Sequence, residues 1–473
     1  RLMALKNDMA AWRTALTHYL VQRGDDAGEE ADYCYHSSST STSTAVTNDT
    51  NDNARRLPPF GGGDYLSCTD SPTPSTPSSP QGLKLFSPIV NRRASRGGKV
   101  SGFSTEATES VDGEGRTAPK KAAAAAAAED ETDALEGRLT SLIGELDRLL
   151  SPVLESPAIA RSLDLFAWQS NKAGRQREGW VLLPDARLLD LPLELLSAFR
   201  KRGLRPASRD LSVHLLARRR DATTETGGGG GGKSSSSKAD LPVSMDDVVY
   251  VVDPRFEDLP QRPSSSSGSG SGSGNSKQRL PRPTICDTMK EVEGICGHMK
   301  GLNGKDHIPS PGEWKSLLTA RKNGGLVYYG LGCCLSYLTP DHLAGLDASG
   351  CRVVILMDRA HNDASLLRQT NIDKDKHVSD LLLEKPVHTA MVWTLAGAGS
   401  IMLNQWASSF HANRRLMLRL FKGISGHGMS IAEALRDATT PDRVAGAKAE
   451  TKLKLRVAYN PVLYGLPSIK IKS

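Results

Sequence analysis

The spacing of apolar residues predicts a helix on each side of a long segment that has no such pattern. Apolar side chains recur every three or four residues over 1–23 and again from Asp130 to Leu150, which is the spacing of an amphipathic helix. Pro152 is expected to end the second helix. Residues 24–129 are rich in Ser, Thr and Pro, so we predict a disordered linker whose Ala122–Ala128 run leads into the second helix.

Beyond residue 150, short apolar runs alternate with amphipathic patterns. Strands are predicted at 180–183, 211–216, 248–252, 326–329, 352–357 and 400–406. Helices are predicted at 191–200, 313–321, 341–346, 364–369, 387–395, 410–421 and 431–438. Apolar strands that alternate with helices indicate a mostly parallel sheet covered on both faces. We therefore predict one α/β domain over 130–473, with Gly- and Ser-rich surface inserts at 223–240 and 262–280.

Composition excludes several classes of protein. Apolar residues make up 38% of the 473-residue chain, and no apolar run approaches the roughly 20 residues that a membrane helix needs. Seven irregularly spaced cysteines do not form a secreted disulfide framework, so we predict a reducing, cytoplasmic compartment. The net charge of +7 suits acidic partners such as tubulin but does not require them. Because the first residue is Arg1, we expect helix 1–23 to be the end of a longer helical region.

Residues 179–196, GWVLLPDARLLDLPLELL, resemble the opening signature of the CHAT family of caspase-like domains, which are related to separase and the caspases. Further blocks follow in the order of that family: VVYVVDP at 248–254, LVYYGLG at 326–332, CRVVILMDR at 351–359, LAGAGSIMLNQW at 395–406, SIAEALRDA at 430–438 and YNPVLYG at 459–465. The resemblance implies a caspase-like three-layer sandwich with a mostly parallel central sheet.

The same resemblance locates the two catalytic positions of the family. Its peptidases use a cysteine thiolate as the nucleophile and a histidine that takes and returns the proton. The histidine position corresponds to Leu331, and the cysteine position corresponds to Asp358 or Arg359. None of these side chains supplies that chemistry. The resemblance therefore implies a pseudo-peptidase with no catalytic residue.

A shifted catalytic pair is the alternative that these residues leave open. Cys333 and Cys334 follow the first strand end, and His361 follows the second. Cys351 begins its strand and lies about 20 Å along it from the functional end, so it does not reach the site. Buried, inert cysteines are the simpler interpretation of all three thiols.

Neither a metal nor a cofactor is predicted. Cys286, Cys296 and His298 fit no common zinc spacing and have no evident fourth ligand. The Gly227–Gly232 run lacks the preceding strand that a phosphate-binding loop needs.

Two basic runs are candidates for binding an acidic surface such as tubulin tails. They lie at 200–202 and 218–220, and a solvated loop is the alternative interpretation of both. No aromatic platform accompanies these charges, so nucleic-acid binding is not expected.

The stretch 343–406 narrows the resemblance to the C-terminal region of the cilia- and flagella-associated protein 46 family, large ciliary proteins with TPR-like repeats ahead of this region. That resemblance implies a structural component of the axonemal central apparatus, in its C1d projection, that functions in cilium assembly and motility. The implied partners are other projection proteins and microtubules, with no nucleic acid, membrane or small-molecule substrate. Two alternatives are a cysteine peptidase of the CHAT or separase-like class with rearranged catalytic residues and a non-ciliary caspase-like adaptor.

Overall fold

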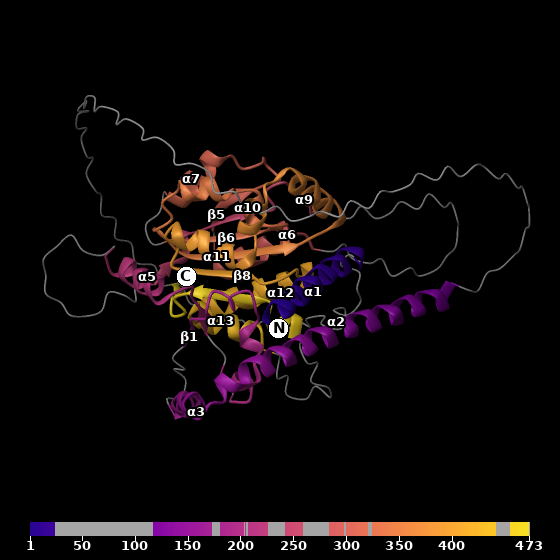
Figure 1. The fold of residues 1–473 in the computed structure, drawn as a ribbon. Helices are drawn as coiled ribbons and strands as arrows, with labels where there is room; N and C mark the ends of the chain where they lie inside the picture. The colour runs from indigo at the N-terminus through magenta and orange to yellow at the C-terminus, as the bar shows by residue number, and fades with distance from the viewer. Residues whose placement is uncertain are drawn as a thin grey trace, which may run out of the picture. The chain divides into compact units, whose positions relative to one another are not determined.

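The computed structural model describes residues 1–23, 117–172, 180–202, 204, 207–225, 242–258, 283–297, 299–319, 324–440 and 455–472. Within these residues, eight strands form one sheet in the order β1-β2-β9-β8-β7-β6-β4-β5, and β10 pairs with β3 (Figure 1). The strands are β1 (Val181–Leu182), β2 (Ser208–Arg209), β3 (Val243–Ser244), β4 (Val248–Val252), β5 (Lys300–Asn303), β6 (Gly324–Leu331), β7 (Cys351–Ala360), β8 (Ser400–Asn404), β9 (Pro461–Gly465) and β10 (Ile471–Lys472).

The large sheet is mostly parallel, as the sequence predicts. Its neighbouring strands run parallel to one another except for β8 and β9, which are antiparallel. The central strands β6 and β7 are fully or almost fully buried along their lengths, which explains why they read as continuous apolar runs. Both extend beyond the predicted ranges, to Leu331 and Ala360.

Helices cover both faces of the sheet. The α-helices of the described residues are α1 (Leu2–Arg23), α2 (Thr117–Leu154), α3 (Pro157–Lys172), α4 (Ser197–Arg200), α5 (Val213–Glu225), α6 (Ile285–Cys296), α7 (Pro311–Thr319), α8 (Pro340–Ala344), α9 (Asp363–Asp375), α10 (Val378–Leu383), α11 (Pro386–Leu395), α12 (Phe410–Phe421), α13 (Ile431–Ala438) and α14 (Leu455–Ala458). Apolar residues of α6, α12 and α13 form one core with alternate residues of β4, β6 and β7. Residues of α7, α8 and α11 form a second core with the intervening strand residues. The predicted α/β sandwich with helices on both faces is therefore confirmed.

A third core joins the N-terminal helix to the sheet domain. The predicted leucine stripe of α2 packs against α1, and both helices contact Trp406 and the apolar residues of 191–204. Trp12 of α1 lies at the centre of this core, edge-on to Trp406 with 5.4 Å between ring centroids. Its indole N–H donates to the carbonyl of Leu135 at 2.9 Å. Helix α1 therefore belongs to the same compact unit as the sheet (Figure 1).

Two local predictions are wrong, and a third has the wrong helix boundary. The predicted strand 211–216 lies largely in α5, because the Ser212 hydroxyl accepts the N–H of Leu215 at 3.2 Å and starts a helix there. Pro152 does not end α2, which continues to Leu154. The proline removes one backbone hydrogen bond of the helix, but it does so in the last turn, where only two residues follow it. Residues 117–129 were predicted as the end of the linker, with the Ala122–Ala128 run leading into the helix. They are already helical, so the role of the alanine run is confirmed and the helix begins earlier than predicted.

The remaining linker, 24–116, lies outside the described residues. The 262–280 insert and all but the first residues of the 223–240 insert also lie outside them; α5 continues to Glu225. The predicted helix 191–200 is a 3-10 turn at Leu193–Leu195 followed by the short helix α4. In the parts of the chain that the structure describes, no helix has the length and apolar character needed to span a bilayer.

Candidate functional site at the carboxyl edge of the sheet

The parallel strands β6 and β7 bring the two predicted catalytic positions to the same edge of the sheet. Leu331, the last residue of β6, pairs with Ala360 of β7. The N–H of Gly332 donates to the carbonyl of Ala360 at 2.9 Å, and the N–H of Arg359 donates to the carbonyl of Gly332 at 3.0 Å. Backbone hydrogen bonds therefore join the two strands at the edge where the two catalytic positions were predicted.

Leu331 lies in the apolar core. Its exposed fraction is 3%, and it belongs to the same cluster as Tyr329, Met357 and Phe410. The residue after it, Gly332, has a φ of +79°, which favours glycine over other residues. The residue at the predicted histidine position is thus an apolar side chain that packs in the core.

Asp358, the first of the two residues at the predicted cysteine position, is almost fully buried. Its carboxylate accepts the backbone N–H of Cys334 at 3.2 Å, and its carbonyl accepts the side-chain amide of Asn404 at 2.9 Å. Burial raises the pKa of Asp358. These contacts tie the side chain to the turn after β6.

Arg359, the second residue at that position, has a left-handed backbone conformation with φ +62°. Its guanidinium Nη2 donates to the carbonyl of Glu384 at 2.6 Å, and its Nε lies 3.9 Å from the carboxylate of Asp358. A non-glycine residue at positive φ is uncommon and coincides here with the register shift at the ends of β6 and β7. The strained residue points its side chain toward the loop after α10.

Cys333 and Cys334, which follow β6, and Cys351, at the opposite end of β7 from the site, are buried thiols. Burial raises the pKa of Cys333 to about 12, that of Cys351 to about 12 and that of Cys334 well above its usual range. The thiol of Cys333 lies 3.8 Å from the carbonyl of Glu384. A high thiol pKa disfavours the thiolate, which is the nucleophilic form.

His361, the histidine of the alternative catalytic pair, lies near Gly332 at the end of β6. A Cβ atom placed on Gly332 would lie 3.9 Å from its Cε1, 3.2 Å from Nη2 of Arg368 and 3.5 Å from Oε1 of Gln369. Burial and the positive charges of Arg359 and Arg368 lower the pKa of His361 to about 4. The imidazole is therefore a weak base in this position.

A charged network that sequence reasoning missed crosses the same edge. Arg368 of α9 forms a two-bond ion pair with Glu257, which follows β4, with Nη2 to Oε2 at 3.0 Å. Its Nη2 also donates to the hydroxyl of Tyr337 at 2.7 Å, and its guanidinium lies 5.1 Å from the centroid of that ring. These residues are far apart in the sequence and follow no motif, so only the fold brings them together.

The other predicted candidates are dispersed. Cys286 and Cys296 lie on α6, and His298 lies outside the described residues. Among the described residues, no group of three or more His, Cys, Asp or Glu is arranged to hold a metal ion. The thiol of Cys286 is a hydrogen-bond donor to the amide oxygen of Asn303 at 3.5 Å, which accounts for it without a metal.

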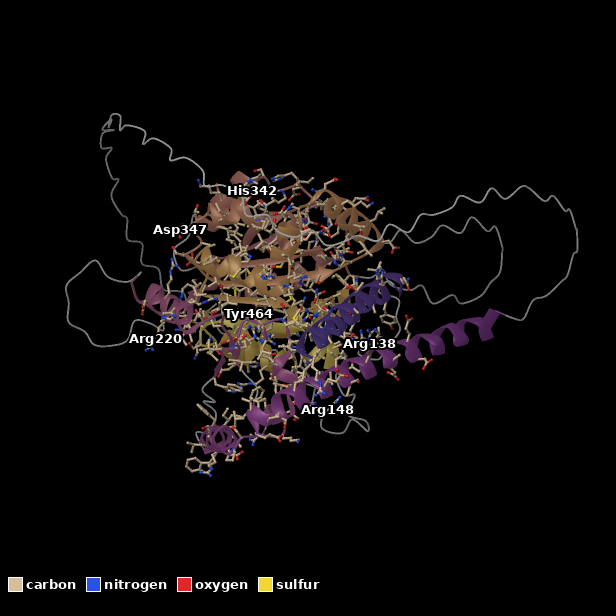
Figure 2. The ribbon with its side chains drawn as sticks, viewed as in Figure 1. Arg138, Arg148, Arg220, His342, Asp347 and Tyr464 are labelled. Atoms are coloured by element: carbon tan, nitrogen blue, oxygen red, sulfur yellow. The ribbon has the colours of Figure 1, made fainter. Side chains whose placement is uncertain are left out.

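The basic run 218–220 is not a continuous patch. Arg219 is buried, with its Nε 3.2 Å from the carboxylate of Asp210 and its Nη1 donating to the carbonyl of Ala398 at 2.7 Å. Arg218 and Arg220 are exposed, and Figure 2 labels Arg220 on α5. The middle charge of the run stabilises the fold and is not available to an acidic surface.

No protein-family model matches the sequence. The solved structures to which the chain is similar include Saccharomyces cerevisiae separase in complex with securin, at 14% identity and a TM-score of 0.36, over 62% of this chain and 16% of the separase chain. They also include the arginine-specific cysteine proteinase gingipain R, at 11% identity and a TM-score of 0.39, over 67% of this chain and 69% of that chain. A complex of the Porphyromonas gingivalis RgpB pro- and mature domains is similar at 11% identity and a TM-score of 0.37, over 68% of this chain and 70% of that chain.

Proposed function

We propose that the chain carries a caspase-like domain that has lost peptidase chemistry and serves as a structural component of the motile cilium. The finer assignment is to the C-terminal region of the cilia- and flagella-associated protein 46 family, in the C1d projection of the axonemal central apparatus. It rests on the sequence blocks within 343–406, and the caspase-like assignment rests on the ordered blocks from 179 to 465. A structural role needs a stable surface and no proton transfer.

The main support for a loss of peptidase activity is the burial of Leu331, an aliphatic residue at the predicted histidine position. Cysteine peptidases need a proton acceptor within hydrogen-bond reach of the thiol. At this position the chain has an aliphatic side chain with 3% exposure, on a strand whose end is closed by backbone hydrogen bonds to β7. At the cysteine position, Asp358 and Arg359 are engaged with the neighbouring turns.

Cys333 and His361 are the strongest pair for a rearranged peptidase, and their surroundings oppose that function. A pKa of about 12 for Cys333 leaves a thiolate fraction on the order of 10⁻⁵ at pH 7. A pKa of about 4 for His361 makes the ring a poor acceptor for the thiol proton. A working pair requires the opposite shifts.

Peptidase chemistry is tested by labelling the full-length chain with a thiol-reactive, substrate-like inhibitor. We expect no His361-dependent, stoichiometric modification of Cys333 or Cys334 by this inhibitor and no cleavage of peptide substrates. A Cys333→Ser variant is the matched control for any signal. Stoichiometric labelling of Cys333 that disappears in this variant and in His361→Asn would overturn the pseudo-peptidase proposal.

The ciliary role is tested separately by localisation. The full-length protein, tagged in a flagellated cell, is expected to co-fractionate with the central apparatus after axoneme extraction, and its removal is expected to impair motility. A tagged protein that stays in the cytosol and leaves motility unchanged would reject the ciliary role and favour the non-ciliary adaptor. That result would leave the labelling experiment and its conclusion unaffected.

A further inference from the structure

Helices α9 and α10 lie over the carboxyl edge of the sheet but are attached to it in an unusual way. Residues 363–383, all of them described, contribute no buried apolar side chain. The buried residues of α9 are Ser365 and Gln369, and α10 has none. Leu367, Val378 and Leu382 are instead 64%, 67% and 41% exposed. Leu383 packs, partly buried, against the second core, and Leu366, Ile372 and Leu381 are half-buried. Apolar burial, the main source of helix stability in a folded protein, is therefore small in this segment.

Polar contacts hold the first part of this segment. Arg368 is bound by Glu257 and Tyr337, as described above. Next to it, the amide oxygen of Gln369 accepts the hydroxyl of Ser336 at 2.9 Å. Ahead of α9, the side-chain amide of Asn362 donates to the carbonyl of Glu257 at 3.1 Å. The Glu257–Arg368 ion pair is the centre of this attachment.

A second set of polar contacts holds the far end. Lys376, between the two helices, pairs with Asp373 at 3.1 Å within the segment and with the carboxylate of Glu384 just beyond it. The carbonyl of Glu384 accepts from Arg359 at 2.6 Å and lies beside the thiol of Cys333. Covering of the strand ends by 363–383 therefore depends on side-chain hydrogen bonds and ion pairs, which contribute less stability than a packed core.

We propose that residues 363–383 form a flap that opens as a unit over the ends of β6 and β7, with the Glu257–Arg368 pair as its latch. Segments with few buried apolar contacts open locally at a lower cost than the global unfolding of the protein. Opening of the flap uncovers His361, which is half-buried in the closed structure, and Cys333, which is buried. The inference does not depend on the proposed ciliary role or on the loss of catalysis.

The first test uses the unmodified full-length chain and native-state hydrogen exchange. Amides of α9 and α10 are expected to exchange at least tenfold faster than those of α11 and α12, which carry buried apolar faces. Exchange in α9 and α10 that is as slow as in α11 would overturn the flap. This comparison needs no variant.

The second test weakens the latch. Arg368→Ala and Glu257→Gln are expected to increase the exchange of α9 amides and the rate of iodoacetamide labelling of Cys333 by about tenfold, with α11 and α12 unchanged. The matched control is Arg414→Ala, which breaks the Glu291–Arg414 pair (2.6 and 2.8 Å) between α6 and α12. We expect it to leave both rates unchanged. Equal acceleration in α9, α11 and α12 by the latch variants would indicate global unfolding and reject a separate flap.

Discussion

Replacing Trp12 tests whether helix α1 is part of the core of the sheet domain. Its side chain is fully buried between α2 and Trp406, and its N–H is bonded to the carbonyl of Leu135. Truncating a buried tryptophan to alanine costs about 3–5 kcal/mol of the free energy of unfolding, and the lost hydrogen bond accounts for roughly 1 kcal/mol of it. We therefore expect Trp12→Ala to lower the free energy of unfolding by about 4 kcal/mol.

The assay is urea unfolding of the full chain, followed by circular dichroism. For an m-value of about 3 kcal/mol/M, a loss of about 4 kcal/mol moves the midpoint down by roughly 1.3 M. Trp12→Phe retains most of the apolar area but not the N–H donor, so about 1–2 kcal/mol is expected. Met3→Ala is the control on the same helix, because Met3 is 69% exposed and should matter by less than about 0.5 kcal/mol.

One result would refute the reasoning. If Trp12→Ala unfolds at the same urea concentration as the unmodified chain, α1 contributes nothing to the cooperative unit that contains the sheet. An early, separate transition of α1 that leaves the main midpoint in place would lead to the same conclusion.

Three further predictions concern Leu331 and the buried polar groups. Leu331→His is expected to lower the free energy of unfolding by about 2–3 kcal/mol, because it buries a polar ring in the core, and to yield no peptide cleavage by the folded variant. Glu194→Gln leaves the buried Arg209 without its carboxylate, and thermal unfolding should show a loss of about 3–5 kcal/mol. Burial raises the pKa of Asp258 to about 6, so the folded state binds this proton more tightly, and the resulting stabilisation is lost as the pH rises from 4 to 6. Burial lowers the pKa of His361 to about 4, so the unfolded state binds this proton more tightly, and the resulting destabilisation is relieved over the same pH range. Relative to the unmodified chain, stability should therefore rise with pH in Asp258→Asn and fall in His361→Gln, by about 2 kcal/mol each between pH 4 and 6.

Each of these has a contradicting outcome. Peptide cleavage by Leu331→His would mean that a functional cysteine lies within reach of that position. An unchanged melting temperature in Glu194→Gln would mean that water replaces the lost carboxylate. Parallel pH profiles for all three chains between pH 4 and 6 would mean that neither Asp258 nor His361 changes its proton affinity on folding.

The sequence by itself predicted the fold class through the alternation of apolar strands and helices, but it did not predict β2, β3, β5, β10, α3 or α6. Strand β4 and helices α12 and α13 have the predicted bounds, because their apolar positions repeat with the period of a single buried strand or a single buried helix face. The resemblance to a known family predicted that Leu331 lies at the histidine position and Asp358 or Arg359 at the cysteine position of a catalytic pair. Adjacent parallel strands end at a common edge, so their proximity followed from the predicted topology.

Only the tertiary structure decided how polar residues distant in sequence are paired. Arg219 looks like part of a basic patch in the sequence but is buried against Asp210, and Arg368 looks like a surface helix residue but bridges to Glu257. The apparent strand at 211–216 became a helix because a local cap outweighed the apolar run. Periodicity along the chain records which face of an element is buried. It does not record which charge on another element will lie opposite, because that depends on how the elements pack in three dimensions.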